Sequence, residues 1–475
     1  MKLTREITSI PYTRLDVDPD SPSTSTKVSW KLFIPVTLSF IFFIFYMDFL
    51  SIDSITEPFI NLRNQGYFGS IFERYDIILR KRPEVEHIDC GRIINGDKEY
   101  MKEIGYNRPY LVNTTLDMDC DSIKSRILPA RNSNTSFPIL YARIVYTDYE
   151  FLEDELVQDY AEENTYCYAI DKDADEEFKI NIHQLSECLP NVIVPKIEEE
   201  MDGYGHNQNR AHLECMELGR ERQWNYIFLL QNHDVLIKTH EEITEILTIY
   251  GGANDVEITP CNNGRCIDSL ERNLGELGLC PMYLNDTELE TCQNSTIEWG
   301  KGAMQTILSR EAIDFIFTQI DIKPLMRQLN DMGAFVDEVL YQSLQITEEI
   351  RLPGGFIHKC REDEKQFVSR KSIWSGNEKE CASGYLRHYI CIYGIEDLSF
   401  LAQSKFIMAN KIMPDFDIGI ASCLSELLWN RTRGIIDHPI DKEYYANINT
   451  VRYHHQRNLP NFNVDSFECV HNITK

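Results

Sequence analysis

The sequence predicts an α/β domain built on a largely parallel sheet and carried on a single membrane anchor. Three observations support this class. Between residues 137 and 430, short apolar runs alternate with helical stretches, as in βαβ units. One apolar run near the N-terminus, residues 32–47, approaches the length of a membrane span. All 14 cysteines follow that run, as expected if the folded part lies in an oxidising compartment.

The predicted anchor covers residues 32–52 and follows a cytosolic tail, residues 1–31. Its uncharged run of 16 residues gives about 24 Å of helix, so its flanks must help to cover a hydrocarbon core of about 30 Å. Basic residues precede the run and acidic residues follow it, which leaves the N-terminus cytosolic. A cleaved signal peptide is the alternative. The run ends in FYMDFLSID, without small residues for cleavage, and this favours an uncleaved anchor.

The part after the anchor is predicted to be luminal. We divide it into a stem and lead-in, residues 53–136, a large domain, residues 137–440, and a C-terminal extension, residues 441–475. Asn-X-Ser/Thr sequons agree with a lumen and predict glycosylation at Asn113, Asn134, Asn285, Asn294, Asn430 and Asn472.

Charge and cysteine spacing argue against nucleic-acid binding and against a zinc site. The net charge of −28 opposes nucleic-acid binding, because phosphates require a basic face. Any anionic ligand must therefore be bound by a few locally placed cations. A zinc site at Cys261, Cys266, Cys280 and Cys292 is an alternative to disulfides, but the spacing lacks the usual paired CxxC. The connectivity of disulfides cannot be read from the sequence.

The elements of the large domain follow from hydrophobic periodicity. The pattern predicts strands and helices in this order: strand 139–147, helix 149–163, strand 165–171, strand 191–196, helix 209–223, strand 225–231, helix 240–250, a weaker strand 302–309, helices 310–319 and 333–345, and a last unit of 385–394, helix 396–404 and 406–412.

Polar residues follow two of the predicted strands. The stretch DKDAD, residues 171–175, ends the strand at 165–171, and QNHD, residues 231–234, ends the strand at 225–231. Ordinary loop polarity explains either stretch by itself. Both nevertheless lie at carboxyl ends of strands, where open α/β sheets bind their ligands.

Two adjacent acids, Asp337 and Glu338, begin the predicted helix GAFVDEVLYQSLQ, residues 333–345. Asp337 has the residue type and place of an N-cap, and acids in a first turn are favoured by the helix dipole. At helical spacing Glu338 falls off the apolar stripe that begins at Val336. Simple capping by both acids is one interpretation, and projection of Glu338 into a crevice is the other.

Seven segments in this order resemble one known family: YCYAIDKDAD, NRAHLECMELG, NYIFLLQNHDVLIKT, WGKGAMQTILSREAIDF, VDEVLYQSL, HYICIYGIEDLSFL and MANKI. The chain resembles the core-2/I-branching β-1,6-N-acetylglucosaminyltransferases, in a divergent form such as nematodes carry. The resemblance covers about residues 137–430.

The resemblance implies a GT-A-like fold with a mixed, largely parallel sheet, on a single-pass type II Golgi anchor. It implies inverting transfer of N-acetylglucosamine from UDP-GlcNAc to a hydroxyl of a glycoprotein O-glycan, giving a β-1,6 branch. No metal and no other cofactor is expected. The alternatives are transfer from another donor such as UDP-xylose, or a catalytically silent member that binds glycans.

The resemblance also implies roles for the acid and the cations. Glu338 looks like the base that deprotonates the acceptor hydroxyl. Lys411 and Arg387 look like the cations that stabilise the UDP diphosphate in place of a metal. An extra residue, His388, follows Arg387 and competes with it for this role.

Further residues are carried over by the same resemblance. Asp171 and Tyr204 look like donor-binding residues, and Glu257 and Arg265 look like acceptor-binding residues. A metal site of the DxD type within residues 171–175 is a competing mechanism. These acids follow the second strand, whereas a metal-dependent enzyme of this fold usually places its pair after the segment 225–231.

Overall fold

The structure is a computed structural model that describes residues 79, 81–128, 136–260, 270–333, 335–363 and 366–470. The chain divides into two units, Met1–Arg80 and Lys81–Lys475. The predicted tail and anchor lie outside the described residues. Within those residues, no helix is long and apolar enough to cross a membrane.

A five-stranded sheet forms the centre of the second unit, in the order β3-β2-β1-β4-β8. Strand β1 pairs in parallel with β2 and β4, β2 pairs in parallel with β3, and only the edge strand β8 is antiparallel in this sheet. The bounds are β1 Ile139–Val145, β2 Thr165–Ile170, β3 Val192–Ile193, β4 Tyr226–Leu230 and β8 Ile307–Ser309. The expected mixed, largely parallel sheet is confirmed.

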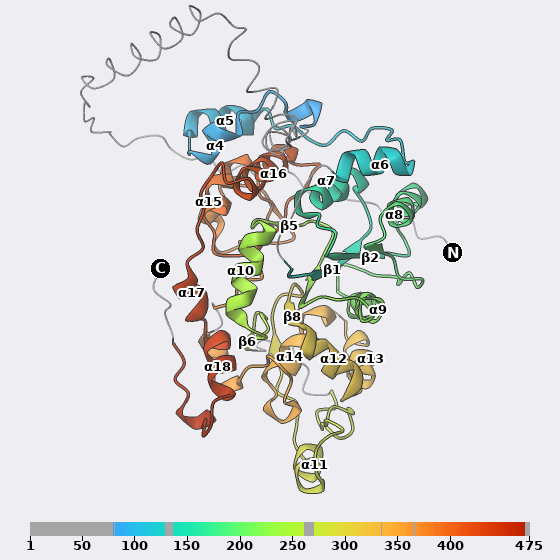
Figure 1. Cartoon of the computed structure of the whole chain (residues 1–475), viewed down its shortest axis with the longest axis vertical. Coiled ribbons are helices and arrows are strands. Elements are labelled where there is room, and N and C mark those ends of the chain that lie inside the picture. The colour runs from blue at the N-terminus through green and yellow to red at the C-terminus, as the bar shows by residue number, and fades with distance from the viewer. Residues whose placement is uncertain are drawn as a thin grey trace, which may run out of the picture. The chain divides into compact units, whose positions relative to one another are not determined.

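Helices cover both faces of this sheet, because alternate residues of each strand point to opposite sides. Ile139 and Tyr141 of β1 belong to a core with α7 and α8, whereas Leu140 and Ala142 belong to a second core with α9, α12 and α13 (Figure 1). The bounds are α7 Tyr149–Asp159, α8 Glu176–Cys188, α9 Gln208–Gly219, α10 His240–Tyr250, α11 Asp286–Gln293, α12 Arg310–Thr318 and α13 Lys323–Asn330.

Three smaller sheets lie beyond the carboxyl ends of the central strands. The largest has the order β5-β12-β9, and the others pair β6 with β7 and β10 with β11. Their bounds are β5 Asp234–Leu236, β6 Thr259–Pro260, β7 Gly300–Lys301, β9 Arg370–Lys371, β10 Leu386–Arg387, β11 Ile390–Cys391 and β12 Met408–Asn410. These short strands carry most of the polar residues considered below.

The segment that we assigned to the stem and lead-in contributes helices to the second unit. These are α4 Cys90–Ile94, α5 Lys98–Tyr106 and α6 Cys120–Ile127. The Arg108 guanidinium donates hydrogen bonds to the carboxylates of Glu396 (2.6 and 2.7 Å) and Asp417 (2.8 Å). Asp417 is fully buried and caps helix α16, Ile418–Thr432. The compact unit therefore begins at Lys81 and includes this lead-in.

The predicted C-terminal extension also packs in this unit, through α17 and α18. The last helices are α15 Leu398–Ala402, α16 Ile418–Thr432, α17 Lys442–Ala446 and α18 Asn449–Arg457. Helix α17 packs against α10, and Tyr445 and Val451 are buried in the same core as β1.

Six disulfides join all the cysteines of the described residues: Cys90–Cys423, Cys120–Cys188, Cys167–Cys215, Cys280–Cys292, Cys360–Cys469 and Cys381–Cys391. Because Cys280 and Cys292 pair with each other, they do not contribute to a zinc site with Cys261 and Cys266. The latter two lie outside the described residues.

The segment 333–345 is not the single helix that its periodicity predicted. It forms a short 3₁₀ helix, η4 Val336–Glu338, and then helix α14 Leu340–Ile346. Phe335 has a positive φ of 60°, and no side chain caps either helix, so the capping role expected for Asp337 is wrong. The polar side chains Gln342, Ser343 and Gln345 of α14 are buried and donate hydrogen bonds. Gln342, for example, donates to the carbonyl of Ala303.

Candidate active site

The carboxyl ends of β1 and β2 bring an aromatic residue and an acid together. Tyr146 follows β1 and is half-exposed, and Asp171 follows β2. Burial raises the pKa of the Tyr146 phenol, and the charges of Arg387 and Asp171 also act on that phenol. The charges of two predicted donor-site residues, Asp171 and Arg387, thus act on one tyrosine. Near the same strand ends, Nε2 of His233, which follows β4, lies 2.8 Å from the carboxylate of Asp148.

Asp234, in the predicted strand-end loop, is a structural hub. It is fully buried, and its carboxylate accepts hydrogen bonds from the Gln231 amide (2.6 Å), the Gln305 side chain (2.9 and 3.1 Å) and the Asn410 side chain (2.7 Å). These donors come from the end of β4, the approach to β8, and β12. Asp234 therefore fixes the place of Asn410 and of its neighbour Lys411.

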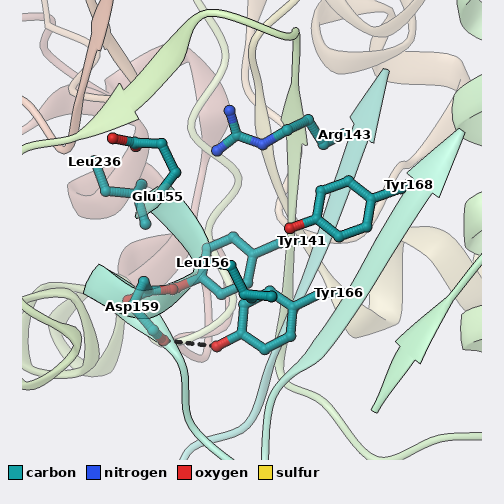
Figure 2. A pocket seen from close by; sticks show the side chains of 8 residues that line it. All are labelled: Tyr141, Arg143, Glu155, Leu156, Asp159, Tyr166, Tyr168 and Leu236. Carbon is teal, nitrogen blue, oxygen red and sulfur yellow. Dashed lines mark hydrogen bonds between the residues drawn. The ribbon is translucent and has the colours of Figure 1, made fainter. Parts of the chain in front are cut away.

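Arg143 of β1 also binds the loop at residues 231–234. Its buried guanidinium donates to the carbonyl oxygens of Gln231 (3.3 Å) and Asp234 (2.7 Å). Figure 2 shows it at a small cavity lined from β1, β2, α7 and β5, where Glu155 and Tyr168 also point inward. Burial raises the pKa of Glu155 to about 8. None of the predicted site residues lines this cavity, so it is distinct from the candidate site.

Three cations gather at the end of β12. Burial lowers the pKa of the Lys411 ammonium, and the positive charges of Arg387 and Arg370 lower it further against the opposing effect of Asp234. Among the described residues, neither Arg387 nor Lys411 pairs with a carboxylate. Cations held close together without a counter-charge form a place where an anion is stabilised.

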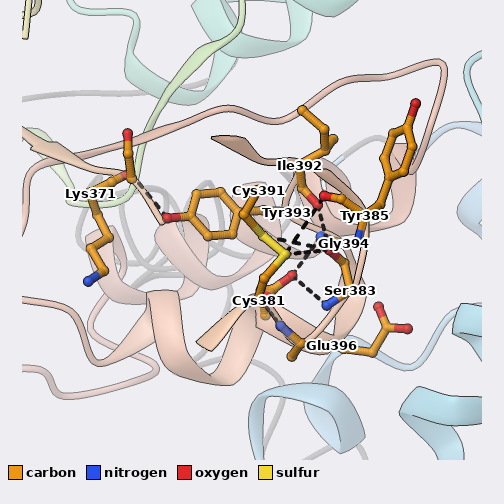
Figure 3. Close-up of a disulfide and its surroundings, with 12 residues drawn as sticks. Lys371, Cys381, Ser383, Tyr385, Cys391, Ile392, Tyr393, Gly394 and Glu396 are labelled. Carbon is orange, nitrogen blue, oxygen red and sulfur yellow. Dashed lines mark hydrogen bonds between the residues drawn. A yellow bond between two sulfur atoms is a disulfide. The ribbon is translucent and has the colours of Figure 1, made fainter. Parts of the chain in front are cut away.

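A disulfide closes the hairpin that carries Arg387. Figure 3 shows Cys381–Cys391 at its base, with Ser383 donating to the Ile392 carbonyl at 2.6 Å. Arg387 lies in β10 and contacts the sulfur of Met413 at 3.3 Å. Partial burial and the charges of Lys411 and Arg387 lower the pKa of His388. This favours Arg387 over His388 as the second cation near neutral pH.

The two acids of η4 have different surroundings. Asp337 is only 7% exposed, and burial, together with the charge of Glu338, raises its pKa to about 7. The Glu338 side chain is 21% exposed, and its carboxylate forms an ion pair with Lys301 of β7. Glu338 is thus the acid that a ligand can reach, and Asp337 is packed away from solvent.

Tyr204 lies beside η4, where its carbonyl accepts the Val336 amide at 3.3 Å. Its side chain is 59% exposed. The next residue, Gly205, has a φ of +91°, and a Cβ there would lie 2.0 Å from the Asp337 carboxylate. Only glycine allows this close approach. The predicted donor-site tyrosine is therefore placed next to the acid pair.

Arg370 connects the acids to the cations. Its guanidinium donates to Gln305 (3.0 Å) and lies 3.7 Å from the carboxylate of Glu257, which in turn accepts the Ala303 amide at 3.0 Å. The charge of Arg370 acts on Asp337 as well as on Lys411. Arg370 thus pairs with Glu257, and its charge acts on the acid of η4 and on Lys411, so we group Glu338, Glu257, Arg370 and Lys411 as one row of charged groups.

Some predicted site residues have a structural role, and one lies outside the described residues. Asp175 caps α8 by accepting the Glu177 amide, and Asp171 accepts the Asp173 amide at 2.8 Å. In the described ranges, no three His, Cys, Asp or Glu side chains gather as a metal site. The predicted acceptor-site residue Arg265 falls outside these ranges.

The sequons mostly lie at the surface. Asn113, Asn285 and Asn294 are exposed, and Asn430 in α16 is partly buried. Asn285 caps α11 through its side-chain oxygen, which leaves the amide nitrogen that carries a glycan free of that contact. The two sequons at Asn134 and Asn472 are outside the described residues.

A family model described as "Core-2/I-Branching enzyme" matches residues 139–402. This stretch contains every central strand and all of the row just described except Lys411, which follows it by nine residues. The chain belongs to the Core-2/I-branching enzyme family. It is an enzyme of the glycosyltransferase class, which the sequence resemblance had predicted.

Named relatives agree with this family. The chain is 24% identical over 377 residues to mouse β-1,3-galactosyl-O-glycosyl-glycoprotein β-1,6-N-acetylglucosaminyltransferase 3, covering 73% of this chain and 84% of the relative. It is also 24% identical over 431 residues to a human enzyme of the same name without the final number. This match covers 83% of this chain and 96% of the human enzyme. A yeast mannosyltransferase, Ktr4p with GDP, has 13% identity and a TM-score of 0.23 over 58% of this chain and 80% of its own. A likeness that low carries no argument.

Sequence reasoning missed Arg370 and Lys301 as members of the site. Arg370 stands in QFVSRKSIW, a short polar segment without periodicity, and only its pairing in parallel with β12 brings it to the site. Lys301 stands in the segment WGKGAMQ that carries the family resemblance, and the charge of that lysine was the available signal.

Replacement of Gly205 tests the packing of the acid pair. Gly205→Ala places a Cβ against Asp337 at a positive φ, so we expect the free energy of unfolding to fall by about 1–3 kcal/mol. Gly203→Ala is the matched control, because nothing lies within 4 Å of a Cβ there. Urea unfolding of both variants measures the difference. Equal losses in the two variants would contradict the packing described here.

Proposed function

We propose that this enzyme transfers N-acetylglucosamine from UDP-GlcNAc to a hydroxyl of a protein-linked O-glycan, with inversion and without a metal ion, to form a β-1,6 branch. The names of the relatives support the donor and the linkage. One observation of the structure carries the proposal. A partly exposed carboxylate, Glu338, belongs to the same row of charged groups as Lys411, and Lys411 and its neighbour Arg387 pair with no carboxylate within the described part of the chain.

In this proposal Glu338 is the general base. The acceptor hydroxyl attacks the anomeric carbon and loses its proton to Glu338, while the bond from that carbon to the diphosphate oxygen breaks on the opposite face. A base must lie within about 2.6–3.2 Å of the proton donor. Lys301 pairs with the Glu338 carboxylate in the free enzyme, and in this proposal the incoming hydroxyl takes over part of that hydrogen bonding.

Lys411 and Arg387 stabilise the leaving group. The departing UDP gains negative charge as the glycosidic bond breaks, and cations fixed in advance stabilise that charge without reorganising. Burial, and then repulsion by Arg387 and Arg370, lowers the pKa of Lys411 in the free enzyme, and in this proposal the repulsion is relieved when the diphosphate binds. In this proposal Asp171, Tyr146 and Tyr204 bind other parts of the donor.

Two other functions remain candidates. A related transferase that uses another donor, such as UDP-xylose, would use the same acid and cations. A silent member would bind a glycan without transfer. The partly exposed carboxylate of Glu338 and the cations at Arg387 and Lys411 favour an active enzyme.

We further propose that the enzyme is a single-pass type II protein of the Golgi membrane with a luminal active site. The six disulfides support an oxidising compartment. The apolar run at residues 32–47 supports an anchor.

A donor panel tests the proposed function. The luminal protein is incubated with UDP-GlcNAc, UDP-xylose or UDP-galactose and an O-glycan bearing β-1,3-linked galactose, and the product is analysed by mass spectrometry and linkage NMR. We expect one added N-acetylhexosamine in a β-1,6 linkage. Transfer from UDP-xylose alone would support the second candidate, and binding of glycan without turnover would support the silent one.

Chelation and Lys411→Ala together test the role of the cations. We expect transfer to survive EDTA and to fall by about 10²–10³-fold in Lys411→Ala, because a fixed ammonium is proposed to stabilise the diphosphate. Lys405→Ala is the control, since Lys405 lies six residues earlier and pairs with Asp441 at 2.8 Å. Activity that is lost on chelation and restored by Mn²⁺ would contradict the metal-independent mechanism and favour a metal site at the acids of residues 171–175.

Glu338→Gln should lose transfer by about 10²–10⁴-fold and keep UDP-sugar binding. Asp337→Asn should keep most turnover. The pKa of Asp337 is raised to about 7 in the folded protein, so its ionisation costs stability as the pH rises from about 4 towards 7. An amide avoids that cost, and the free energy of unfolding of Asp337→Asn at pH 8 should be no lower than that of the parent. Steady-state kinetics and urea unfolding measure the pair. Near-normal turnover by Glu338→Gln would exclude it as the base.

A further inference from the structure

His206 joins the loop after Tyr204 to the segment that leads into η4. Its Nδ1 lies 2.8 Å from the Asp202 carboxylate, and its Nε2 lies 2.8 Å from the carbonyl oxygen of Met332. Met332 stands four residues before Val336, where η4 begins. One imidazole thus bridges two segments that are far apart in the sequence.

Both partners of this imidazole are hydrogen-bond acceptors. A carbonyl oxygen can only accept, and an ionised carboxylate can only accept, whereas a neutral imidazole has a single N–H to donate. Asp202 is ionised near neutral pH, because its hydrogen bonds from His206 and Tyr204 outweigh the effect of partial burial and lower its pKa. Both contacts of His206 are therefore satisfied only when its ring carries two protons.

Other contacts hold the same two segments in register. The Asn207 amide donates to the side chain of Asn330 at 2.7 Å, and Asn330 donates back at 3.1 Å. Val336 donates its amide to Tyr204, and the side chain of Asn209 donates to the Val336 carbonyl at 3.1 Å. These contacts use groups that do not titrate near neutral pH. Among these bridging hydrogen bonds, those of His206 depend on its protonation, and the nearby Asp337, whose pKa is raised to about 7, also responds to pH but makes none of them.

We infer that His206 is a positioning residue for Glu338, and that it holds η4 in place as the imidazolium. The inference rests on the proposed function, since it gives η4 the base. His206 does not contact the reacting atoms. It acts through the backbone at Met332, which with Tyr204 sets where the 3₁₀ turn of Val336 to Glu338 lies.

The charged groups around His206 favour the imidazolium. Asp202 faces it from its own loop, and Asp337 acts on it from η4. Hydrogen bonds to Met332 and Asp202 are the main causes that raise its pKa above the ordinary value. Because the folded-state pKa is raised, the bridge is complete at lower pH and is lost as the pH rises through that pKa. Transfer should therefore decline on the alkaline side.

The first test is the pH dependence of kcat and of the acceptor KM in the luminal protein. His206→Gln leaves one side-chain donor, and we expect kcat to fall about 10- to 100-fold at the parent's optimum, as for a misplaced reacting group. The alkaline limb due to His206 should disappear. In Asp202→Asn the limb should move to lower pH, because the charge that stabilises the imidazolium is gone. His183→Gln is the control, since His183 lies on α8, 4.0 Å from Glu198.

The second test does not need turnover. Hydrogen exchange of the amides at 332–338 is compared between the parent, His206→Gln and His183→Gln at one pH below the parent's alkaline limb. We expect faster exchange in His206→Gln alone, above all at Val336. Urea unfolding verifies that each variant is folded under these conditions.

The two tests separate this inference from the proposed function. If the parent transfers no sugar but His206→Gln still exchanges faster than the parent, the bridging role of His206 stands and the proposed function is rejected. An unchanged pH profile and unchanged exchange in an active His206→Gln would reject the positioning role. An alkaline limb that persists in His206→Gln belongs to another group, such as Lys411, and would also reject it.

Discussion

The buried carboxylate of Asp234 is the interaction on which the arrangement of the site depends. A charge without water is tolerated only when hydrogen bonds surround it. Here they come from Gln231, Gln305 and Asn410, and each belongs to a different part of the chain. The central sheet and the small sheet of β5, β9 and β12 therefore meet at one point. Lys411 directly follows Asn410 in the chain. The contacts of Asp234 therefore also fix the position of this cation at the end of β12.

Periodicity predicted the central sheet because β1, β2 and β4 are buried on both faces and read as unbroken apolar runs. Of the smaller sheets, β10, β11 and β12 fall in the predicted segments 385–394 and 406–412, whereas β5, β6, β7 and β9 gave no such signal, because two or three residues are too few for a period. The segment 333–345 misled for a different reason. Its spacing fits a helix, but the positive φ of Phe335 and the packing of Asp337 on Gly205 divide it, and burial of Gln342 depends on neighbours that the local sequence does not contain.

The site was predictable where the family resemblance supplied roles and the strand ends supplied position. Glu338, Asp171 and Lys411 could be named in this way. The difference between Asp337 and Glu338 could not, because neighbouring acids in a sequence have the same local signals. What separates them is burial: one carboxylate is packed against a glycine and the other meets a lysine. The link through Arg370 also needed the fold, since it comes from a strand pairing between distant segments.

The order of the disulfides along the chain has a consequence for proteolysis. Cys90 is joined to Cys423, and Cys360 is joined to Cys469, so the two closed loops overlap. Any single cut between Cys90 and Cys469 falls inside at least one of these loops, and the two pieces stay covalently joined. A protease acting once in this region leaves the mass on a non-reducing gel unchanged. One cut can release a separate fragment only before Cys90 or after Cys469.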